Sequence, residues 1–168
     1  MGIIPDYIIG DLDSADIKTI DYFKDKKTKV IHDTNPDKTD MELAISLAET
    51  LSPSEIIILG AIGDRIDHTL ANILCLTYIK SDVKAKIVNE KNIIELVEDS
   101  IDLNGKKDDI ISIVPLTDIS DLNYSGLKWN VKDLKTNLGW FGICNKLEND
   151  QANISFSKGK ILVIRVRG

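Results

Sequence analysis

The chain has 168 residues, of which 43% are hydrophobic and 29% charged, the balance of an ordinary soluble globular protein. Its net charge of −6 argues against non-specific nucleic-acid binding through a broad basic face. No stretch approaches the roughly twenty apolar residues of a membrane span, and no basic start leads into an apolar run. We therefore expect no nucleic-acid partner, no membrane partner and no signal peptide.

The first half of the sequence alternates short apolar runs with amphipathic segments. Strands are predicted at residues 7–9, 28–32 and 55–59, and helices at 15–24, 39–51 and 66–78. Because strands that alternate with helices are joined by right-handed crossovers, this pattern predicts a parallel sheet. The β-branched run at 55–59 also predicts a strand covered on both faces. We expect an α/β lobe over residues 1–82.

The second half changes to an all-β pattern. Turn signals at Asn104-Gly105 and Lys158-Gly159 separate short apolar runs. The predicted strands are 83–89, 93–98, 109–114, 127–131, 151–156 and 160–166. An antiparallel β-sandwich over residues 83–168 follows from this pattern. The expected fold class is therefore α/β, with an N-terminal parallel-sheet lobe followed by a β-sandwich lobe.

Acidic residues gather at three places where an apolar run ends or a helical pattern begins, in segments 10–14, 37–40 and 63–68. Strand-to-helix turns of an open α/β sheet lie at its carboxyl edge, where ligands bind. Carboxylates gathered at that edge repel one another unless a cation lies among them. The arrangement therefore favours a hard metal ion that carries phosphates.

Asp11 and Asp13 lie two residues apart, so both carboxylates of an extended turn could reach one cation. Mg²⁺ suits such a pair because it binds one or two carboxylates, keeps several waters and takes phosphate oxygens as further ligands. A structural alternative is that Asp13 or Ser14 caps the helix beginning at Ala15, with Asp11 solvated. The D-x-D pattern alone leaves both open.

The second cluster has a similar alternative. Thr39 and Glu42 fit a capping box, and Asp40 in the first helical turn complements the helix dipole. Capping by Thr39 does not prevent Asp40 from pointing outward to a metal ion.

The third cluster places Arg65 and Asp67 at a helix start, directly after a buried strand. Arg65 could bind a phosphate with two hydrogen bonds, while Asp67 orients a water, a metal ion or Arg65 itself. The alternative is a surface pair in which the two side chains satisfy each other. His68 could act as an acid or base, although a hydrogen-bonded structural histidine is the commoner case.

Trp129 lies in the predicted strand 127–131, where tryptophan is more often core than ligand platform, although an exposed indole would stack on a cationic ring. Cys75 and Cys144 form no CxxC or Cys/His pattern. We expect them to be buried thiols of a cytoplasmic protein.

Taken together, the motifs resemble those of the thiamine pyrophosphokinase family over most of the chain. The acidic clusters resemble its GDxDS, DxTD and G-x-x-G-x-R-x-D-H segments. The second half resembles its G-L-x-W strand, its G-x-S-N turn and its last hairpin. The matching segments in this sequence are 5–14, 37–40, 60–68, 125–129, 142–145 and 157–159.

The resemblance implies an α/β lobe followed by a β-sandwich lobe, working as a homodimer with the active site at the subunit interface. It also implies transfer of an intact diphosphoryl group from ATP to the hydroxyethyl oxygen of thiamine, giving thiamine diphosphate and AMP. Charge builds up on the bridging and leaving oxygens in such a transfer, so electrostatic clamping matters more than covalent chemistry.

The resemblance also assigns roles to single residues. Asp11, Asp13 and Asp40 would hold Mg²⁺ against the triphosphate. Arg65 would bind phosphate oxygens, and Asp67 would lie close to the incoming hydroxyl or the metal ion. Further contacts to ATP would come from Asp37, Thr39 and His68.

On the thiamine side, Trp129 would stack on the substrate, and Asn145 with the turn at Cys144 would shape the pocket. Cys144 stands where the family usually has serine, a change expected to weaken a hydrogen bond to substrate without abolishing binding. The family has a further strand and helix ahead of the first motif, whereas this motif begins a few residues after Met1. Either the natural start lies upstream, or the α/β lobe lacks its first strand-helix unit.

Two alternatives to this activity remain open. One is a pyrophosphokinase for another hydroxyalkyl heterocycle, such as a pterin, with a different β-lobe pocket. The other is a non-catalytic protein that binds a nucleotide or thiamine.

Overall fold

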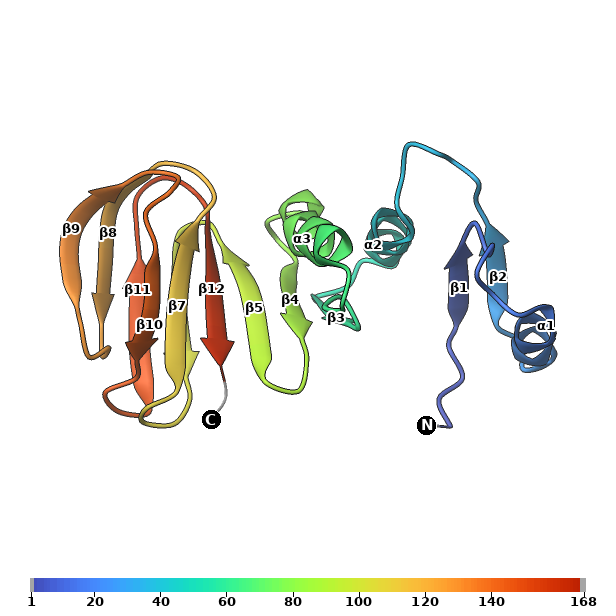
Figure 1. Cartoon of the computed structure of the whole chain (residues 1–168), viewed down its shortest axis with the longest axis horizontal. Coiled ribbons are helices and arrows are strands. Elements are labelled where there is room, and N and C mark those ends of the chain that lie inside the picture. The colour runs from blue at the N-terminus through green and yellow to red at the C-terminus, as the bar shows by residue number, and fades with distance from the viewer. Residues whose placement is uncertain (1, 167–168) are drawn as a thin grey trace. The chain divides into compact units, whose positions relative to one another are not determined.

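The computed structural model describes residues 2–166, so Met1 and the last two residues of the predicted second lobe lie outside the described part. The chain divides into two compact units, Met1–Pro53 and Ser54–Gly168 (Figure 1).

The first unit contains a two-stranded parallel sheet and two helices. Strand β1 (Tyr7–Gly10) pairs with β2 (Lys29–His32), with Gly10 opposite His32. Helix α1 (Ile17–Asp25) connects the two strands, and α2 (Asp40–Thr50) follows β2 and packs against β1. The predicted strand-helix alternation and parallel pairing are therefore both present. Because β1 and β2 run in the same direction, the turns that follow them lie at one edge of this sheet.

The two helices of this unit begin with different caps. Asp16 caps α1, and its Oδ1 accepts a hydrogen bond from Lys18 N at 3.4 Å. The structural alternative, in which Asp13 or Ser14 caps a helix from residue 15, is therefore wrong. The capping box of α2 is confirmed: the Thr39 hydroxyl accepts from Glu42 N, and the Glu42 carboxylate accepts from Thr39 N at 2.8 Å.

The second unit contains two sheets that enclose the core. The larger sheet has the strand order β10-β7-β12-β5-β4-β3, and the smaller has β6-β11-β8-β9. Their strands are β3 (Glu55–Leu59), β4 (Lys84–Val88), β5 (Asn92–Val97), β6 (Ser100–Asn104), β7 (Ile110–Pro115), β8 (Ile119–Ser125), β9 (Val131–Thr136), β10 (Gly142–Lys146), β11 (Gln151–Ser155) and β12 (Ile161–Val166). Only β3 and β4, among the described strands of this unit, pair in parallel.

A single hydrophobic cluster packs between these sheets. Ile111 and Ile113 of β7 and Ile161 of β12 meet Leu122 of β8 and Ile154 of β11, and all five are fully buried. Figure 1 shows the two sheets stacked face to face. The predicted β-sandwich is confirmed, because alternate residues of both sheets fill one core.

The parallel strands β3 and β4 extend the larger sheet of this sandwich. Helix α3 (Ile66–Leu74) and the 3₁₀-helix η1 (Cys75–Tyr78) form the crossover between them. Consequently the compact units divide after Pro53, whereas the sequence predicted lobes that divide after residue 82. Within its unit β3 is an edge strand that pairs with β4 alone, and Leu59 is 71% exposed. The prediction that β3 is covered on both faces is therefore wrong for this unit.

The predicted strand at 127–131 is also wrong. Residues 128–130 form a bend between β8 and β9, and β9 begins only at Val131. Gly126 has φ +78°, and an ideal Cβ there would lie 2.4 Å from the carbonyl oxygen of Gln151. The backbone turns sharply against β11 at this glycine, where a side chain would clash. Four strands were not predicted from the sequence: β6, β8, β9 and β10.

Candidate active site

The turn after β1 presents the first two acidic residues. Leu12 has φ 59°, so the backbone turns between Asp11 and Asp13 rather than running extended. The Asp13 backbone N–H donates to Asp11 Oδ1 at 3.1 Å, and the Ser14 hydroxyl donates to Asp13 Oδ1 at 2.7 Å. Both carboxylates are exposed, and Asp16 rather than either of them caps α1. They therefore remain accessible to a ligand.

Asp40 lies against the same end of β1. An ideal Cβ on Gly10 would lie 2.5 Å from Asp40 Oδ1 and 2.9 Å from its Cγ. Gly10 has φ +150°, a conformation that side-chain-bearing residues rarely adopt. The structure thus brings the second acidic cluster to the strand end from which the first departs, and a Cβ at position 10 would force the Asp40 carboxylate to move.

The donor set at this edge fits a magnesium ion that also holds phosphates. Among the described residues, Asp11, Asp13 and Asp40 form no salt bridge. No group of three or more described acidic, histidine or cysteine side chains is assembled as a metal cage. Mg²⁺ needs only one or two carboxylates when phosphate oxygens and waters complete its octahedron. The open carboxylates therefore suit Mg²⁺ bound together with a polyphosphate.

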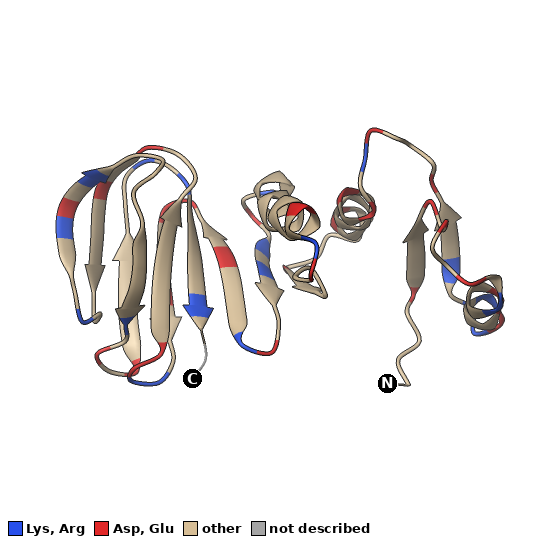
Figure 2. Cartoon of the chain, in the orientation of Figure 1, with Lys and Arg blue, Asp and Glu red and all other residues tan. Residues whose placement is uncertain are grey.

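Asp37 and Thr39 lie just ahead of α2, and Figure 2 shows acidic residues in this turn and in the turn after β1. The backbone N–H of Asp37 donates to Asn35 Oδ1 at 3.0 Å, while its side chain is exposed. The Thr39 hydroxyl accepts from Glu42 N and donates to the Glu42 carboxylate at 2.9 Å. Hydrogen bonds from Thr39 lower the pKa of Glu42 below its usual value. Thr39 therefore has a structural role at the start of α2.

In the second unit, the loop between β3 and α3 is tied to the helix that follows it. The Thr69 hydroxyl accepts from Gly63 N and donates to Gly63 O, both at 3.1 Å. Asn72 Nδ2 donates to the carbonyl of the buried Ala61 at 3.0 Å. Sequence reasoning did not identify Thr69 or Asn72. Their spacing of three residues, on the helix face that follows a glycine-containing turn, is the signal that could have found them.

Arg65 and Asp67 bind each other at the start of α3. Arg65 Nε donates to Asp67 Oδ1 at 3.2 Å, and its Nη2 donates to Oδ2 at 2.5 Å. These bonds hold the pKa of the Asp67 carboxyl at about 2, well below its usual value. A guanidinium has five N–H donors, so this pairing leaves others for an anion. The structure shows the mutual pair, with both side chains exposed.

His68 follows this pair on the first turn of α3, and its side chain is exposed. Within residues 2–166, no side-chain hydrogen bond holds its ring, so it does not match the structural histidine that the sequence favoured.

Trp129 and Asn145 come together in the second unit. Trp129 lies in the bend between β8 and β9 and its side chain is 56% exposed, so it is not a core residue. Asn145 of β10 is buried, and its side chain bonds to the backbone of Trp129 at both N–H and C=O. Lys128 Nζ lies 4.9 Å from the centroid of the Trp129 ring, within the range of a cation–π contact.

The two cysteines have different environments. Both are thiols, as predicted, and Cys75 is buried. Cys144 is exposed, which contradicts the prediction that it is buried. It has φ 62° and lies in a bulge where β10 shifts register against β7. The bulge breaks the strand alternation, so Cys144 and its neighbour Ile143 both face outward, next to the buried Asn145.

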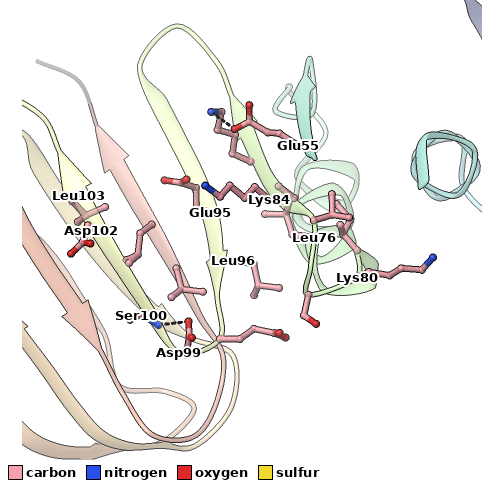
Figure 3. A pocket seen from close by; sticks show the side chains of 18 of the residues that line it. Glu55, Leu76, Lys80, Lys84, Glu95, Leu96, Asp99, Ser100, Asp102 and Leu103 are labelled. Atoms are coloured by element: carbon pink, nitrogen blue, oxygen red, sulfur yellow. Dashed lines mark hydrogen bonds and ion pairs between the residues drawn. The ribbon is translucent and has the colours of Figure 1, made fainter. Parts of the chain in front are cut away.

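A cavity of about 660 Å³ in the second unit contains none of the predicted site residues (Figure 3). Leu76, Leu96 and Leu103 supply apolar walls, and charged side chains line the rest. Across one wall, Lys86 pairs with Glu55 at 2.7 Å, while burial raises the pKa of Glu95. The motif residues lie in turns outside this cavity, so it does not identify the site for ATP or thiamine.

Family models match both halves of the chain in order. A model described as thiamin pyrophosphokinase, catalytic domain, matches residues 1–88. A model described as thiamin pyrophosphokinase, vitamin B1 binding domain, matches residues 98–161. The first range contains the acidic clusters and the Arg65–Asp67 pair, and the second contains Trp129 and Asn145.

Individual relatives agree with these matches. The thiamine pyrophosphokinase of Bacillus subtilis is 31% identical over 98% of this chain and 79% of its own length. Thiamine pyrophosphokinase 2 of Arabidopsis thaliana is 29% identical over 80% of this chain, which spans 55% of that longer protein.

Solved structures show the same fold. The crystal structure of the Bacillus subtilis thiamine pyrophosphokinase superposes with a TM-score of 0.88, at 29% identity, over 99% of this chain and 81% of that one. The Candida albicans thiamin pyrophosphokinase gives a TM-score of 0.82 over 98% of this chain and 74% of that chain, and its 22% identity supports the fold alone. Together the comparisons favour thiamine over a pterin-like substrate, and an enzyme over a non-catalytic binding protein.

Proposed function

The chain belongs to the thiamin pyrophosphokinase family, and we propose that it transfers the terminal diphosphoryl group of ATP to thiamine. The hydroxyl oxygen of thiamine forms a bond to the β-phosphorus. The bond between this phosphorus and the α–β bridging oxygen breaks, and AMP leaves with that oxygen and the bonding electron pair. The hydroxyl proton passes to solvent or a nearby base. The products are thiamine diphosphate and AMP.

The acidic edge of the first unit is the proposed site for Mg²⁺ and the triphosphate. Asp11, Asp13 and Asp40 would hold the ion, which when bound neutralises phosphate charge and orients the oxygens for displacement. Their exposure and the close approach of Asp40 to Gly10 support this assignment. Asp37 would contribute from the turn ahead of α2, where Thr39 fixes the start of the helix.

The start of α3 is the proposed phosphate clamp. The guanidinium of Arg65 would bind phosphate oxygens through the N–H groups that Asp67 leaves available. Asp67 would hold the guanidinium plane in place and lie near the incoming hydroxyl. His68, exposed on the next position, would add a contact to ATP. The bonds from Thr69 to Gly63 support this role because they fix the loop ahead of Arg65.

The bend at Trp129 is the proposed thiamine platform. Thiamine carries a cationic thiazolium ring, and an exposed indole binds a cation over its face. The Lys128 ammonium beside the ring in this structure supports that preference. The exposed turn at Cys144 would form the neighbouring wall, and the buried Asn145 lies behind it.

We also propose a homodimer in the cytoplasm, with the active site at the subunit interface. Helix α3 and η1 expose an apolar stripe at four-residue intervals, formed by Ile66, Leu70, Leu74 and Tyr78. A stripe of this kind marks a surface that another protein surface covers.

No described helix has the length and apolar character needed to cross a membrane. Light scattering in solution should give twice the 18.7 kDa mass of one chain.

The order of the two family matches along one chain carries the proposal, because it joins a diphosphate-transferring half to a vitamin B1 binding half. The test incubates the protein with ATP, Mg²⁺ and thiamine and separates the nucleotides and thiamine esters by chromatography. We expect equimolar AMP and thiamine diphosphate. Formation of ADP alone, or AMP release that does not depend on thiamine, would overturn the proposal.

A further inference from the structure

Asn145 is one of the few polar side chains that are buried among the described residues, with 6% of its surface exposed. Its Nδ2 donates to the carbonyl oxygen of Trp129 at 2.7 Å. Its Oδ1 accepts from the backbone N–H of Trp129 at 3.1 Å and from Lys146 N at 2.9 Å. The amide therefore binds both polar groups of one backbone residue, and both ends of the amide are engaged within the protein.

The bend that carries Trp129 is otherwise anchored on either side of this residue. Leu127 is fully buried, and its N–H donates to Asn130 Oδ1 at 3.1 Å. Lys128 N donates to the carbonyl of Lys146 at 2.9 Å. Asn145 supplies the side-chain bonds that fix the backbone at Trp129 itself, the residue whose indole projects outward.

The bulge in β10 explains how Asn145 reaches this position. Gly142 pairs with Ile113 and Asn145 with Ile111, so β10 has three steps where β7 has two. Cys144 N donates to the Ser112 hydroxyl at 3.1 Å, which holds the extra residue in place. A bulge re-aims the following side chain, and here Asn145 points inward while Cys144 stays exposed.

We propose that Asn145 is a positioning residue that sets the orientation of Trp129 and does not itself contact thiamine. The inference rests on the proposed function, because that function makes Trp129 the thiamine platform. Only a carboxamide of this length offers a donor and an acceptor together to the two backbone groups. A carboxylate would accept from Trp129 N but leave the Trp129 carbonyl without its donor, and it would bury a charge.

A double-mutant cycle separates positioning from contact. Asn145→Ala, Trp129→Ala and the double variant are compared by KM for thiamine, KM for ATP and kcat. We expect each single variant to raise KM for thiamine about tenfold, the effect of losing roughly one buried interaction. KM for ATP should stay unchanged. In the Trp129→Ala background, Asn145→Ala should add almost nothing, because its effect passes through Trp129. If Asn145→Ala raises KM for thiamine as much in the Trp129→Ala background as in the wild type, Asn145 contacts thiamine directly and the proposal is overturned.

Tryptophan fluorescence tests the same point without turnover. The chain has two tryptophans, so a Trp140→Phe background leaves Trp129 as the single reporter. Without thiamine, Asn145→Ala and the milder Asn145→Ser should lower the anisotropy of Trp129 emission, because the freed backbone lets the indole move. The matched control is Asn153→Ala, whose amide bonds to Asp102 instead, and it should leave the emission unchanged. Unchanged anisotropy in both Asn145 variants would overturn the positioning role.

The Trp140→Phe protein also separates failure of the positioning role of Asn145 from failure of the proposed function. If thiamine does not quench Trp129 and Trp129→Ala leaves KM for thiamine unchanged, the thiamine platform is wrong. The anisotropy result would still report on whether Asn145 positions Trp129.

Discussion

The acidic edge of the first unit and the Trp129 bend of the second unit are organised in opposite ways. Asp11, Asp13 and Asp40 are exposed carboxylates, and the described part of the chain offers them no salt bridge. Trp129 is held by a buried amide that bonds to its own backbone. The carboxylates of the first region are open to solvent, whereas the backbone that carries Trp129 is fixed by hydrogen bonds within the protein. Substitutions should therefore affect turnover at the edge and substrate affinity at the bend.

The largest effect is expected at the acidic edge. Asp13→Asn or Asp40→Asn should lower kcat by about three orders of magnitude, because each removes a charge that we propose holds the metal ion against the phosphates. Stability should change by less than about 0.5 kcal/mol, since both side chains are exposed. Steady-state kinetics and thermal unfolding measure the two quantities.

Asp16→Ala is the matched control for this prediction. Asp16 caps α1, so its loss should cost about 1 kcal/mol of stability while turnover is retained. Near-normal turnover in both Asp13→Asn and Asp40→Asn would show that these acids do not hold the metal ion.

Gly10→Ala should have the next largest effect. The new Cβ would lie 2.5 Å from Asp40 Oδ1 and would displace that carboxylate. We expect kcat/KM for Mg-ATP to fall by about tenfold to a hundredfold, as for loss of an aligned catalytic group. The same change in an Asp40→Asn background should cost far less activity. An equal loss in both backgrounds would show that Gly10 acts independently of Asp40.

Arg65→Lys tests the phosphate clamp. A lysine cannot keep two bonds to Asp67 and also bind phosphate in the plane of a guanidinium, so KM for ATP should rise about tenfold. The control is Arg165→Lys on β12, whose guanidinium donates to the Asn104 carbonyl, and KM for ATP should be unchanged there. Equal ATP affinity in wild type and Arg65→Lys would remove Arg65 from the clamp.

The smallest expected effect is the change of protein stability with pH that the Arg65–Asp67 pair causes. The folded pKa of Asp67 is about 2, below the ordinary value of 3.8 for an aspartate, so its contribution to stability is present above pH 3.8 and is lost as pH falls through about 2. NMR titration of the Asp67 carboxyl should show this low midpoint, and Arg65→Ala should raise it towards 3.8. A midpoint near 3.8 in the wild type would show that the pair is not formed in solution.

Local signals in the sequence predicted much of this fold. The run at 55–59 gave the bounds of β3, and the capping box at Thr39 and Glu42 gave the start of α2. Both depend on neighbouring residues. The bend at Trp129 does not: it requires the close approach of Gly126 to Gln151 and the amide of Asn145, which is sixteen residues away. Contacts between residues this far apart in the sequence are set by the tertiary fold. The local pattern of 127–131 does not contain them, and taken alone it predicted a strand.

In the candidate site, too, some features follow from local sequence and others from the tertiary fold. Motif spacing identified Asp11, Asp13 and Asp40, but it did not show that the backbone is left-handed at Leu12 or that Asp16, rather than Asp13, caps α1. Asn145 was expected in the thiamine pocket, and its burial follows from a bulge that no local pattern indicated.

Transfer of label from ATP tests the central claim most directly. The protein is incubated with thiamine, Mg²⁺ and ATP labelled with ³²P at the β-phosphate, and the products are separated. Diphosphoryl transfer predicts that all transferred label appears in thiamine diphosphate, with one AMP released for each. Label that remains in ADP while thiamine gains only an unlabelled phosphate would contradict the account.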